Sequence, residues 1–196
     1  KLKKNNEILK QKKKFGKLYF DGDRKFGYGG YYDDGRWKSV ARDIIKHYKL
    51  KKGSKILDVG CAKGYLVKEL HNMGMNAFGI DISKYAISKS PKIIKKKLQV
   101  SSLLSIPFKK NTFDLVLCIN TLHNLNKINC EKGIAELLRV GKNKFFMQVD
   151  SYYNLEQEKL FLDWVLTAQY HDYPNEWRKL FKKTGYNYDY NWTILK

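Results

Sequence analysis

The sequence predicts an α/β fold, in which a doubly wound, mostly parallel sheet of seven strands carries helices on both faces. Short apolar runs alternate with helical patterns along most of the 196 residues, as expected of strands joined by crossover helices. The run at residues 55–59 passes directly into a turn bracketed by Gly60 and Gly64, and a helical pattern follows. The next apolar run ends on Asp81, near the offset at which such sheets place a carboxylate against a ribose diol.

Each element of the parallel part follows from its own local pattern. Residues 37–48 carry apolar side chains at helical spacing, which predicts an amphipathic helix. Ser83 is a suitable helix cap, and Pro91 ends the helix that Ser83 begins. The run at 113–119 is the most apolar, so we expect it at the centre of the sheet. The predicted elements are a helix at 37–48, a strand at 55–59, a helix at 64–73, a strand at 77–80, a helix at 84–89, strands at 98–100 and 113–119, a helix at 131–140 and a strand at 145–149.

The last third of the chain predicts two more helices and two strands. Residues 155–169 carry an apolar stripe at helical spacing. Pro174 lies in the first turn of a second helix, where its missing N–H does no harm, and Gly185 is well placed to end that helix. Residues 186–190 and 192–195 are typical of closing strands.

The organisation along the chain is a single domain with an attached segment. Residues 1–37 are basic and then rich in glycine and aromatic side chains, so we expect them to form a cap or a lid. Residues 38–196 form the main domain, with residues 151–172 as an insertion at the edge of the sheet where substrates bind.

Composition excludes some classes of protein and leaves one question open. No apolar run approaches the length of about 20 residues that a membrane helix needs. The three cysteines lack metal-ligand spacing, so we expect reduced thiols, no metal site and a cytoplasmic protein. The formal net charge is +20 and comes mainly from lysine. Such a charge arises from a solvated surface or from an acidic partner, for example RNA, a phosphorylated metabolite or a nucleotide sugar.

The glycine turn carries the main resemblance to a known family. An acid two residues ahead of the turn would repel a pyrophosphate but suits a ligand with an ammonium and a sulfonium group. The segment 55–64 resembles the first motif of class I S-adenosylmethionine-dependent methyltransferases, hydrophobic-Leu-Asp-hydrophobic-Gly-Cys-Gly-x-Gly, with Ala62 in place of the second glycine. The resemblance implies a Rossmann-like methyltransferase fold that closes with an antiparallel strand pair. It also implies S-adenosylmethionine as cofactor, with a methionine pocket shaped by Asp58, Gly60, Cys61, Ala62 and Gly64.

Two further segments extend the resemblance over residues 38–150. Ser102 occupies the place where related proteins carry an aspartate that accepts from the adenine amino group, and a serine oxygen can accept the same hydrogen bond. Ile82 and Leu103 would sandwich the adenine, and Asp81 would hold the ribose. The segment from Asn120 to His123 follows the central strand and would face the methyl group.

The acceptor side of the site offers weaker signals. His123 is a candidate general base, or it packs structurally under the cofactor. Residues 26–37 suit a lid whose aromatic faces attract the sulfonium, with Tyr28 as a second candidate catalytic side chain, or a cap attached by its aromatics. They are similar to the openings of small stand-alone methyltransferases of bacterial surface-sugar and related pathways. The remaining candidate substrate contacts are Tyr31, Tyr32, Arg36, Trp37, Tyr152, Trp164 and Tyr170.

These observations predict an enzyme that transfers a methyl group from S-adenosylmethionine to a small acidic or sugar-like acceptor, on oxygen or nitrogen. One alternative is RNA methylation through the basic surface, although the motif used for exocyclic amines is missing. Another is a non-catalytic partner subunit that binds S-adenosylmethionine. The departures from the family motif at Ala62 and Ser102 favour this alternative. Asp58 and Asp81 oppose it, because a cofactor site that is no longer used needs neither carboxylate. A dehydrogenase is a third and more distant alternative.

Overall fold

A computed structural model describes residues 15–195 and contains one parallel sheet of six strands. The order across the sheet is β3-β2-β1-β4-β5-β6. The chain therefore reverses its direction of travel between the neighbouring strands β1 and β4, the place where doubly wound sheets bind ligands. The strands are β1 (Lys55–Val59), β2 (Asn76–Asp81), β3 (Leu98–Val100), β4 (Leu115–Ile119), β5 (Phe145–Asp150) and β6 (Asp189–Thr193).

The prediction of a seventh strand and of a closing antiparallel pair is wrong for the described residues. A single strand, β6, replaces the two expected strands, and it pairs in parallel with β5. Residues 186–188 form an irregular loop, in which Tyr186 is buried and its hydroxyl donates to the Asp189 carbonyl at 2.7 Å. The Tyr186 ring lies 5.2 Å from Phe181. The aromatic pattern that suggested a strand thus reflects packing of this loop on a helix.

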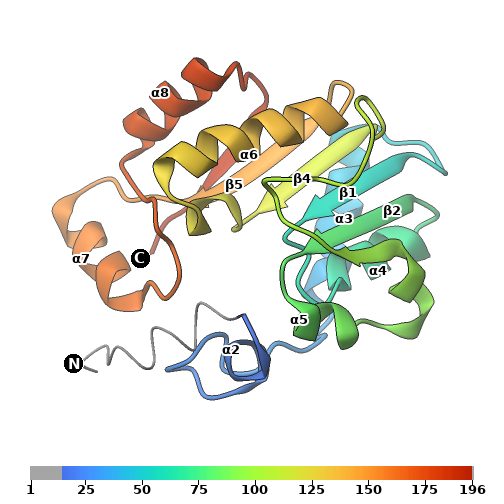
Figure 1. Cartoon of the computed structure of the whole chain (residues 1–196), viewed down its shortest axis with the longest axis horizontal. Helices are drawn as coiled ribbons and strands as arrows, with labels where there is room; N and C mark the ends of the chain where they lie inside the picture. The colour runs from blue at the N-terminus through green and yellow to red at the C-terminus, as the bar shows by residue number, and fades with distance from the viewer. Residues whose placement is uncertain (1–14, 196) are drawn as a thin grey trace.

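Helices cover both faces of the sheet (Figure 1). On one face, α6 and α8 pack over a core that contains Leu57, Val116 and Met147, and on the other α3 and α4 pack over Ile56 and Leu117. The helices are α2 (Lys17–Asp21), α3 (Arg36–His47), α4 (Tyr65–Asn72), α5 (Lys84–Ser88), η1 (Lys92–Lys97), η2 (Leu122–Asn124), α6 (Lys127–Val140), α7 (Leu155–Trp164) and α8 (Pro174–Thr184).

Local capping confirms several predicted helix ends. The Ser83 hydroxyl accepts a hydrogen bond from the Ala86 N–H at 2.9 Å and begins α5. Gly185 takes a left-handed conformation, φ +73°, immediately after α8. Helix α6 begins earlier than predicted, because the Asn126 side chain accepts from the Asn129 N–H at 2.9 Å.

Helix α7 ends five residues earlier than predicted, at Trp164. The N–H groups of Gln169 and Tyr170 both donate to the carbonyl of His123, at 2.8 and 3.1 Å. The backbone N–H groups after α7 therefore bond to η2 instead of to carbonyl groups of α7. This contact brings the insertion to the edge of the sheet.

Residues 15–35 contain α2 and are called the cap below. Figure 1 shows α2 beyond the carboxyl ends of the strands, near α5. The lysine-rich lead predicted for residues 1–14 lies outside the described residues. Within the described range, no helix is both long and apolar enough to span a bilayer, and no cluster of three His, Cys, Asp or Glu side chains is arranged to bind a metal ion.

Candidate active site

The turn between β1 and α4 requires a glycine at its first position. Gly60 has φ +83°, and a Cβ built on it would lie 1.9 Å from the Thr121 hydroxyl oxygen. The N–H groups of Gly60 and Cys61 both donate to the Ile80 carbonyl, at 2.8 and 3.0 Å. The turn is therefore attached to β2 on one side and pressed against the end of β4 on the other.

Ala62 has the left-handed conformation of a glycine, with φ +51°. That conformation costs an alanine roughly 1–2 kcal/mol. Its methyl group is buried in a cluster with Tyr19 and Phe20 of the cap and Ala86 of α5, and its N–H donates to Asp81 Oδ2 at 2.8 Å. Packing of this methyl group against the cap offsets part of the backbone strain.

Lys63 attaches the cap to this turn, a role that the sequence interpretation missed. Its side chain is buried, and Nζ lies 2.5 Å from Asp21 Oδ1 and donates to the Tyr31 carbonyl at 2.7 Å. The Tyr85 hydroxyl donates to the other Asp21 oxygen at 2.7 Å. Residue 63 falls on the unspecified position of the motif, so the sequence pattern offered no signal for this contact.

A cavity of about 230 Å³, called the cofactor cavity below, opens at the carboxyl ends of β1, β2 and β4. Seven of the predicted cofactor residues line it: Gly60, Ala62, Asp81, Ile82, Ser102, Leu103 and Asn120. Phe15, Tyr19, Phe20 and Tyr28 of the cap also border it. The Ser102 hydroxyl already accepts from the Leu104 N–H at 3.1 Å. The cap is therefore part of the cavity wall.

Asp58, Cys61 and Gly64 are not among the residues that line this cavity. Gly64 is the left-handed residue that precedes α4, and the Cys61 thiol packs where a side chain on Gly79 would otherwise lie. Asp58 is buried, and burial, together with the neighbouring Asp81 carboxylate, raises its pKa to about 7. Burial also raises the pKa of Asp81, whose two oxygens accept N–H groups from Ala62 and Ser83 at 2.8 and 2.7 Å. The partly buried Asp81 carboxyl group at the cavity, with the buried Asp58 carboxyl group near it, favours a positively charged ligand.

A second cavity, of about 370 Å³, adjoins the first and shares Tyr19, Tyr28, Asn120 and Asn124 with it. Its other walls come from the cap, η2, the ends of β5 and β6 and the segment after α7: Arg24, Gly27, His123, Asp150, Trp164, Val165, Leu166, Thr167, Ala168 and Thr193. Among the predicted acceptor-side residues, Tyr28, His123 and Trp164 meet here. Arg24, Asp150 and Thr193 were not predicted.

His123 and Asp150 form the buried polar pair of the second cavity. His123 Nδ1 accepts a hydrogen bond from the Asp150 N–H at 3.0 Å, and His123 Nε2 lies 3.4 Å from Asp150 Oδ2. Burial, with a smaller contribution from His171, lowers the pKa of His123 to about 3. Burial raises the pKa of Asp150 to about 7, although Thr193 acts in the opposite direction. The imidazole is therefore neutral at pH 7, and the contact is not an ion pair.

Asn120 lies between the cavities and is held by a short chain of hydrogen bonds. Its backbone is left-handed, φ +50°, a conformation that asparagine tolerates better than most residues. The Thr193 hydroxyl donates to Asn120 Oδ1 at 2.8 Å and accepts from Gln148 Nε2 at 2.9 Å. Strands β5 and β6 thus position the residue that follows β4.

The other candidate substrate residues lie away from both cavities. Tyr31 stacks on Tyr65, and Tyr32 is 70% exposed. Tyr152 is buried against Phe161, and Tyr170 packs on Trp177. These rings are parts of packed clusters or of the surface, which a sequence pattern of aromatics does not distinguish from a binding site.

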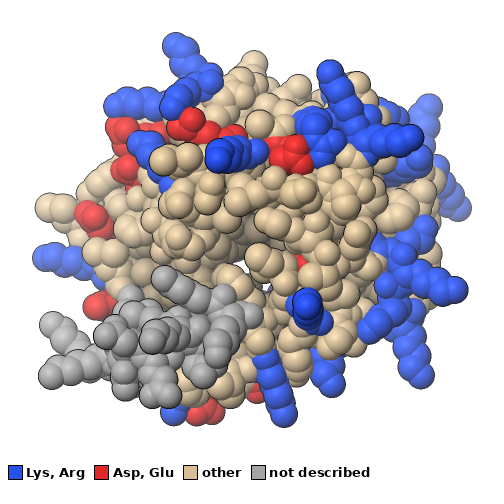
Figure 2. All heavy atoms as spheres, in the orientation of Figure 1, with Lys and Arg blue, Asp and Glu red and all other residues tan. Residues whose placement is uncertain are grey.

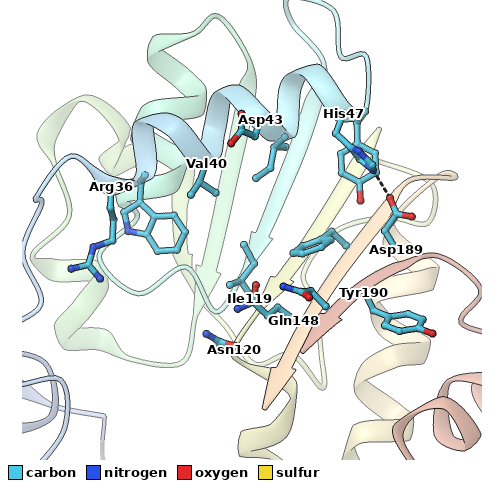
Figure 3. Close-up of a pocket in the computed structure, with 14 residues that line it drawn as sticks. Arg36, Val40, Asp43, His47, Ile119, Asn120, Gln148, Asp189 and Tyr190 are labelled. Carbon is cyan, nitrogen blue, oxygen red and sulfur yellow. Dashed lines mark hydrogen bonds and ion pairs between the residues drawn. The ribbon is translucent and has the colours of Figure 1, made fainter. Parts of the chain in front are cut away.

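Arg36 and Trp37 border a separate groove of about 790 Å³ between α3 and the strands β4 to β6 (Figure 3). The Arg36 guanidinium forms an ion pair with Asp34, and the far end of the groove is closed by His47 Nε2, 2.8 Å from Asp189 Oδ2. Asn120 lines this groove as well as the two cavities.

Comparison with known proteins identifies the fold and the domain. Residues 57–145 match the family model described as a methyltransferase domain. The chain is 31% identical over 123 residues to the uncharacterized protein MJ0638 of Methanocaldococcus jannaschii, covering 63% of this chain and 52% of that protein. It is 29% identical over 138 residues to a ubiquinone biosynthesis O-methyltransferase of Pelagibacter ubique, covering 64% of this chain and 58% of that protein. It thus spans about half the length of the curated relatives it matches.

The described structure also resembles solved structures. A chain from the complex that contains the Trm112 methyltransferase activator of Haloferax volcanii superposes with a TM-score of 0.64 at 16% identity, covering 92% of this chain and 76% of that chain. At that level of identity the likeness concerns the fold.

The residues at the first cavity fit the cofactor of this family. A carboxylate at the end of β2, apolar side chains on Ile82 and Leu103, and a second buried acid suit a nucleoside that carries an ammonium and a sulfonium group. Residues 57–145 therefore match a methyltransferase domain, and the parallel sheet and the residues at the first cavity fit S-adenosylmethionine as its cofactor.

Proposed function

We propose that this protein transfers the methyl group of S-adenosylmethionine to a small-molecule acceptor bound in the second cavity, called the acceptor cavity from here on. The observation that carries the proposal is the pair of adjoining cavities, which share Tyr19, Tyr28, Asn120 and Asn124. A sulfonium methyl group held at Asn120 would face a ligand in the acceptor cavity. Direct displacement then needs alignment and exclusion of water, which the cap and the insertion are placed to supply.

In this proposal each part of the cofactor cavity has a task. Gly60 and Ala62 border the methionine end, and Gly64 shapes the same turn without lining the cavity. Asp58, which also does not line the cavity, stabilises the positive charge together with its neighbour Asp81. Asp81 binds the ribose hydroxyls. Ile82 and Leu103 contact the adenine, and Ser102 remains a candidate partner of its amino group. Residues 15–35 act as a lid, since Tyr19, Phe20 and Tyr28 border the cavity.

The acceptor is a small acidic or sugar-like molecule, methylated on oxygen or nitrogen. Aromatic side chains of Tyr19, Tyr28 and Trp164 supply flat surfaces, and Arg24 supplies a positive charge. The three cysteines are buried free thiols, which supports a reducing compartment such as the cytoplasm.

RNA methylation is the second candidate, because the net charge is +20. In the view of Figure 2, most of the described Lys and Arg side chains stand at the rim of the molecule. Tan atoms border the central hollow above and to the right, and one blue side chain stands just below it. A basic surface that guided RNA to the methyl donor would instead be expected around that hollow. The charge distribution in this view therefore favours the small-molecule acceptor.

Calorimetry with S-adenosylmethionine, followed by transfer of a tritiated methyl group into separated metabolite, RNA and protein fractions, tests the proposal. We expect binding, and label in the metabolite fraction. Binding without transfer to any fraction would favour the non-catalytic partner subunit. An absence of binding at millimolar cofactor would refute both methyltransferase proposals.

A further inference from the structure

The acceptor cavity contains a buried acid that the cofactor does not need. Asp150 is the last residue of β5, is only 4% exposed and lines this cavity but not the cofactor cavity. Its backbone is held at both polar groups: the N–H donates to His123 Nδ1 at 3.0 Å, and the carbonyl accepts from Trp177 Nε1 at 3.1 Å. Two packed neighbours therefore hold the backbone from which its carboxyl group projects.

The same contacts remove His123 from the role of general base. Its Nδ1 lone pair is occupied by the Asp150 N–H, so the ring proton of the neutral imidazole lies on Nε2. The His123 Nε2 atom lies 3.4 Å from Asp150 Oδ2. The His123 ring therefore has no free nitrogen lone pair with which to take a proton from the methyl acceptor.

We propose that the Asp150 carboxylate removes the proton from a phenolic hydroxyl group of the acceptor, and that His123 is a positioning residue that holds Asp150 in place. This inference rests on the proposed function. The acceptor oxygen forms a bond to the methyl carbon while the sulfur–methyl bond breaks, and its electron pair stays on sulfur as the neutral thioether. The hydroxyl proton passes to Asp150, so the methyl ether leaves uncharged at that oxygen.

Several features of the cavity favour a hydroxylated aromatic acid over an amine. A buried base is of most use to a hydroxyl group, which must lose its proton as the new bond forms, whereas an amine attacks through a free lone pair. Tyr19, Tyr28 and Trp164 suit a planar ring. The Arg24 guanidinium lies 5.5 Å from the Trp164 ring centre, and its Nη1 donates to the Gly27 carbonyl at 2.6 Å. It forms no ion pair with a carboxylate among the described residues, so its remaining N–H groups are placed to bind a carboxylate of the ligand.

Other charged and titratable groups also surround Asp150, and a pH test has to include them. His123 of η2 lies beside it. Three side chains of the cap line the same cavity: Tyr19, Tyr28 and Arg24. His171, from the segment before α8, acts on His123. Burial lowers the pKa of His123 and raises that of Tyr19. Tyr28 is half exposed as a residue, but desolvation of its hydroxyl group raises its pKa as well. Burial raises the pKa of Asp150 to about 7, so its carboxyl group is expected to lose its proton near neutral pH.

The test uses a pair of probes that differ in whether they need a base. The hydroxyl group of 4-hydroxybenzoate keeps its proton at pH 7, whereas that of tetrafluoro-4-hydroxybenzoate is already ionised. We expect Asp150→Asn to bind S-adenosylmethionine like the wild type and to lower kcat for the first probe by about 10²-fold or more, with a much smaller loss for the second. We expect His123→Asn, which keeps an acceptor for the Asp150 N–H, to lower kcat for the first probe less. Asp163→Asn, an exposed acid of α7, is the matched control.

The wild-type protein provides a second readout if Asp150→Asn does not fold. We expect kcat for 4-hydroxybenzoate to rise with pH through about 7 and to level off above it, while kcat for the fluorinated probe stays flat. Equal losses for both probes in Asp150→Asn, or matching pH profiles, would overturn the role of Asp150. Cofactor binding with transfer to 4-aminobenzoate only, or to none of the three probes, would overturn the phenolic acceptor and leave the proposed function standing. An absence of cofactor binding would refute the proposed function itself.

Discussion

At the scale of single residues, Gly60 shows how closely the turn approaches its neighbours. Its φ is +83°, and a Cβ at this position would come within 1.9 Å of the Thr121 side chain. Gly53 has φ +81° and no atom within 4 Å of such a Cβ. Substituting Gly53 therefore tests the energetic cost of the left-handed backbone alone, whereas substituting Gly60 adds the cost of the clash with Thr121.

We predict that Gly60→Ala lowers the free energy of unfolding more than Gly53→Ala does. The left-handed backbone costs either alanine about 1–2 kcal/mol, and overpacking against Thr121 adds about 1–3 kcal/mol at residue 60. Urea unfolding of both variants measures the difference. Equal losses would show that the turn moves away from Thr121 without cost.

The acid pair at Asp58 and Asp81 predicts that cofactor binding depends on pH. In the protein without cofactor, Asp58 has a pKa of about 7. The ammonium and sulfonium groups of a bound cofactor would lower this pKa. Binding would then release a proton, so affinity should rise as pH increases toward 7 and become constant above it.

Calorimetry in buffers of different ionisation enthalpy measures this proton release. We expect the release at pH 6 in the wild type and its loss in Asp58→Asn. An observed heat that does not change with the buffer would contradict the assignment of Asp58 to the positive end of the cofactor.

At the scale of elements, the Lys63–Asp21 contact joins the cap to the glycine turn. Lys63 is buried and the Asp21 side chain is 30% exposed, so solvent screens part of the interaction. The contact holds α2 close to the cofactor cavity, and its strength should influence how often the cap opens.

We predict that Lys63→Met weakens the attachment of the cap by about 1–2 kcal/mol and speeds release of S-adenosylmethionine by about tenfold. Hydrogen exchange of residues 15–35 and stopped-flow displacement of cofactor measure the two effects. Lys25→Met, which removes a largely exposed ion pair with Asp23 in the same cap, is the control. Similar release rates for both variants would mean that the cap does not gate the cavity.

At the scale of the whole molecule, the +20 charge raises the question of nucleic-acid binding. Lysines at the rim bind phosphates non-specifically, and such binding weakens steeply with salt. Catalysis on a small acceptor inside a cavity has no such dependence.

We therefore predict that RNA binding disappears between 50 and about 200 mM salt while methyl transfer into metabolites stays nearly constant. Filter binding and the tritium assay, run at the same salt concentrations, make the comparison. Label in RNA that falls together with RNA binding would show that the basic surface serves the reaction.

Local patterns in the sequence were sufficient to predict much of this fold. β1 and β3 have their predicted bounds, as has α8, while Ser83 caps α5 and Gly185 ends α8. Each of these features depends on residues a few positions apart, because strand runs, caps and left-handed glycines act within one turn of chain. The glycine turn and Asp81 belong to the same class of signal.

Features that depend on which distant segments meet were beyond such patterns. The direction of β6 follows from the path through α8, and the early end of α7 from hydrogen bonds to His123. Asp150 lies 3.4 Å from a histidine that is 27 positions away, and Lys63 contacts an acid 42 positions away. A residue's neighbours across the sheet edge are set by the topology and by the packing of the cap and insertion, not by its neighbours in the sequence. Local sequence thus establishes the glycine turn, whereas the residues that line the second cavity come together only where β5, η2 and the cap converge.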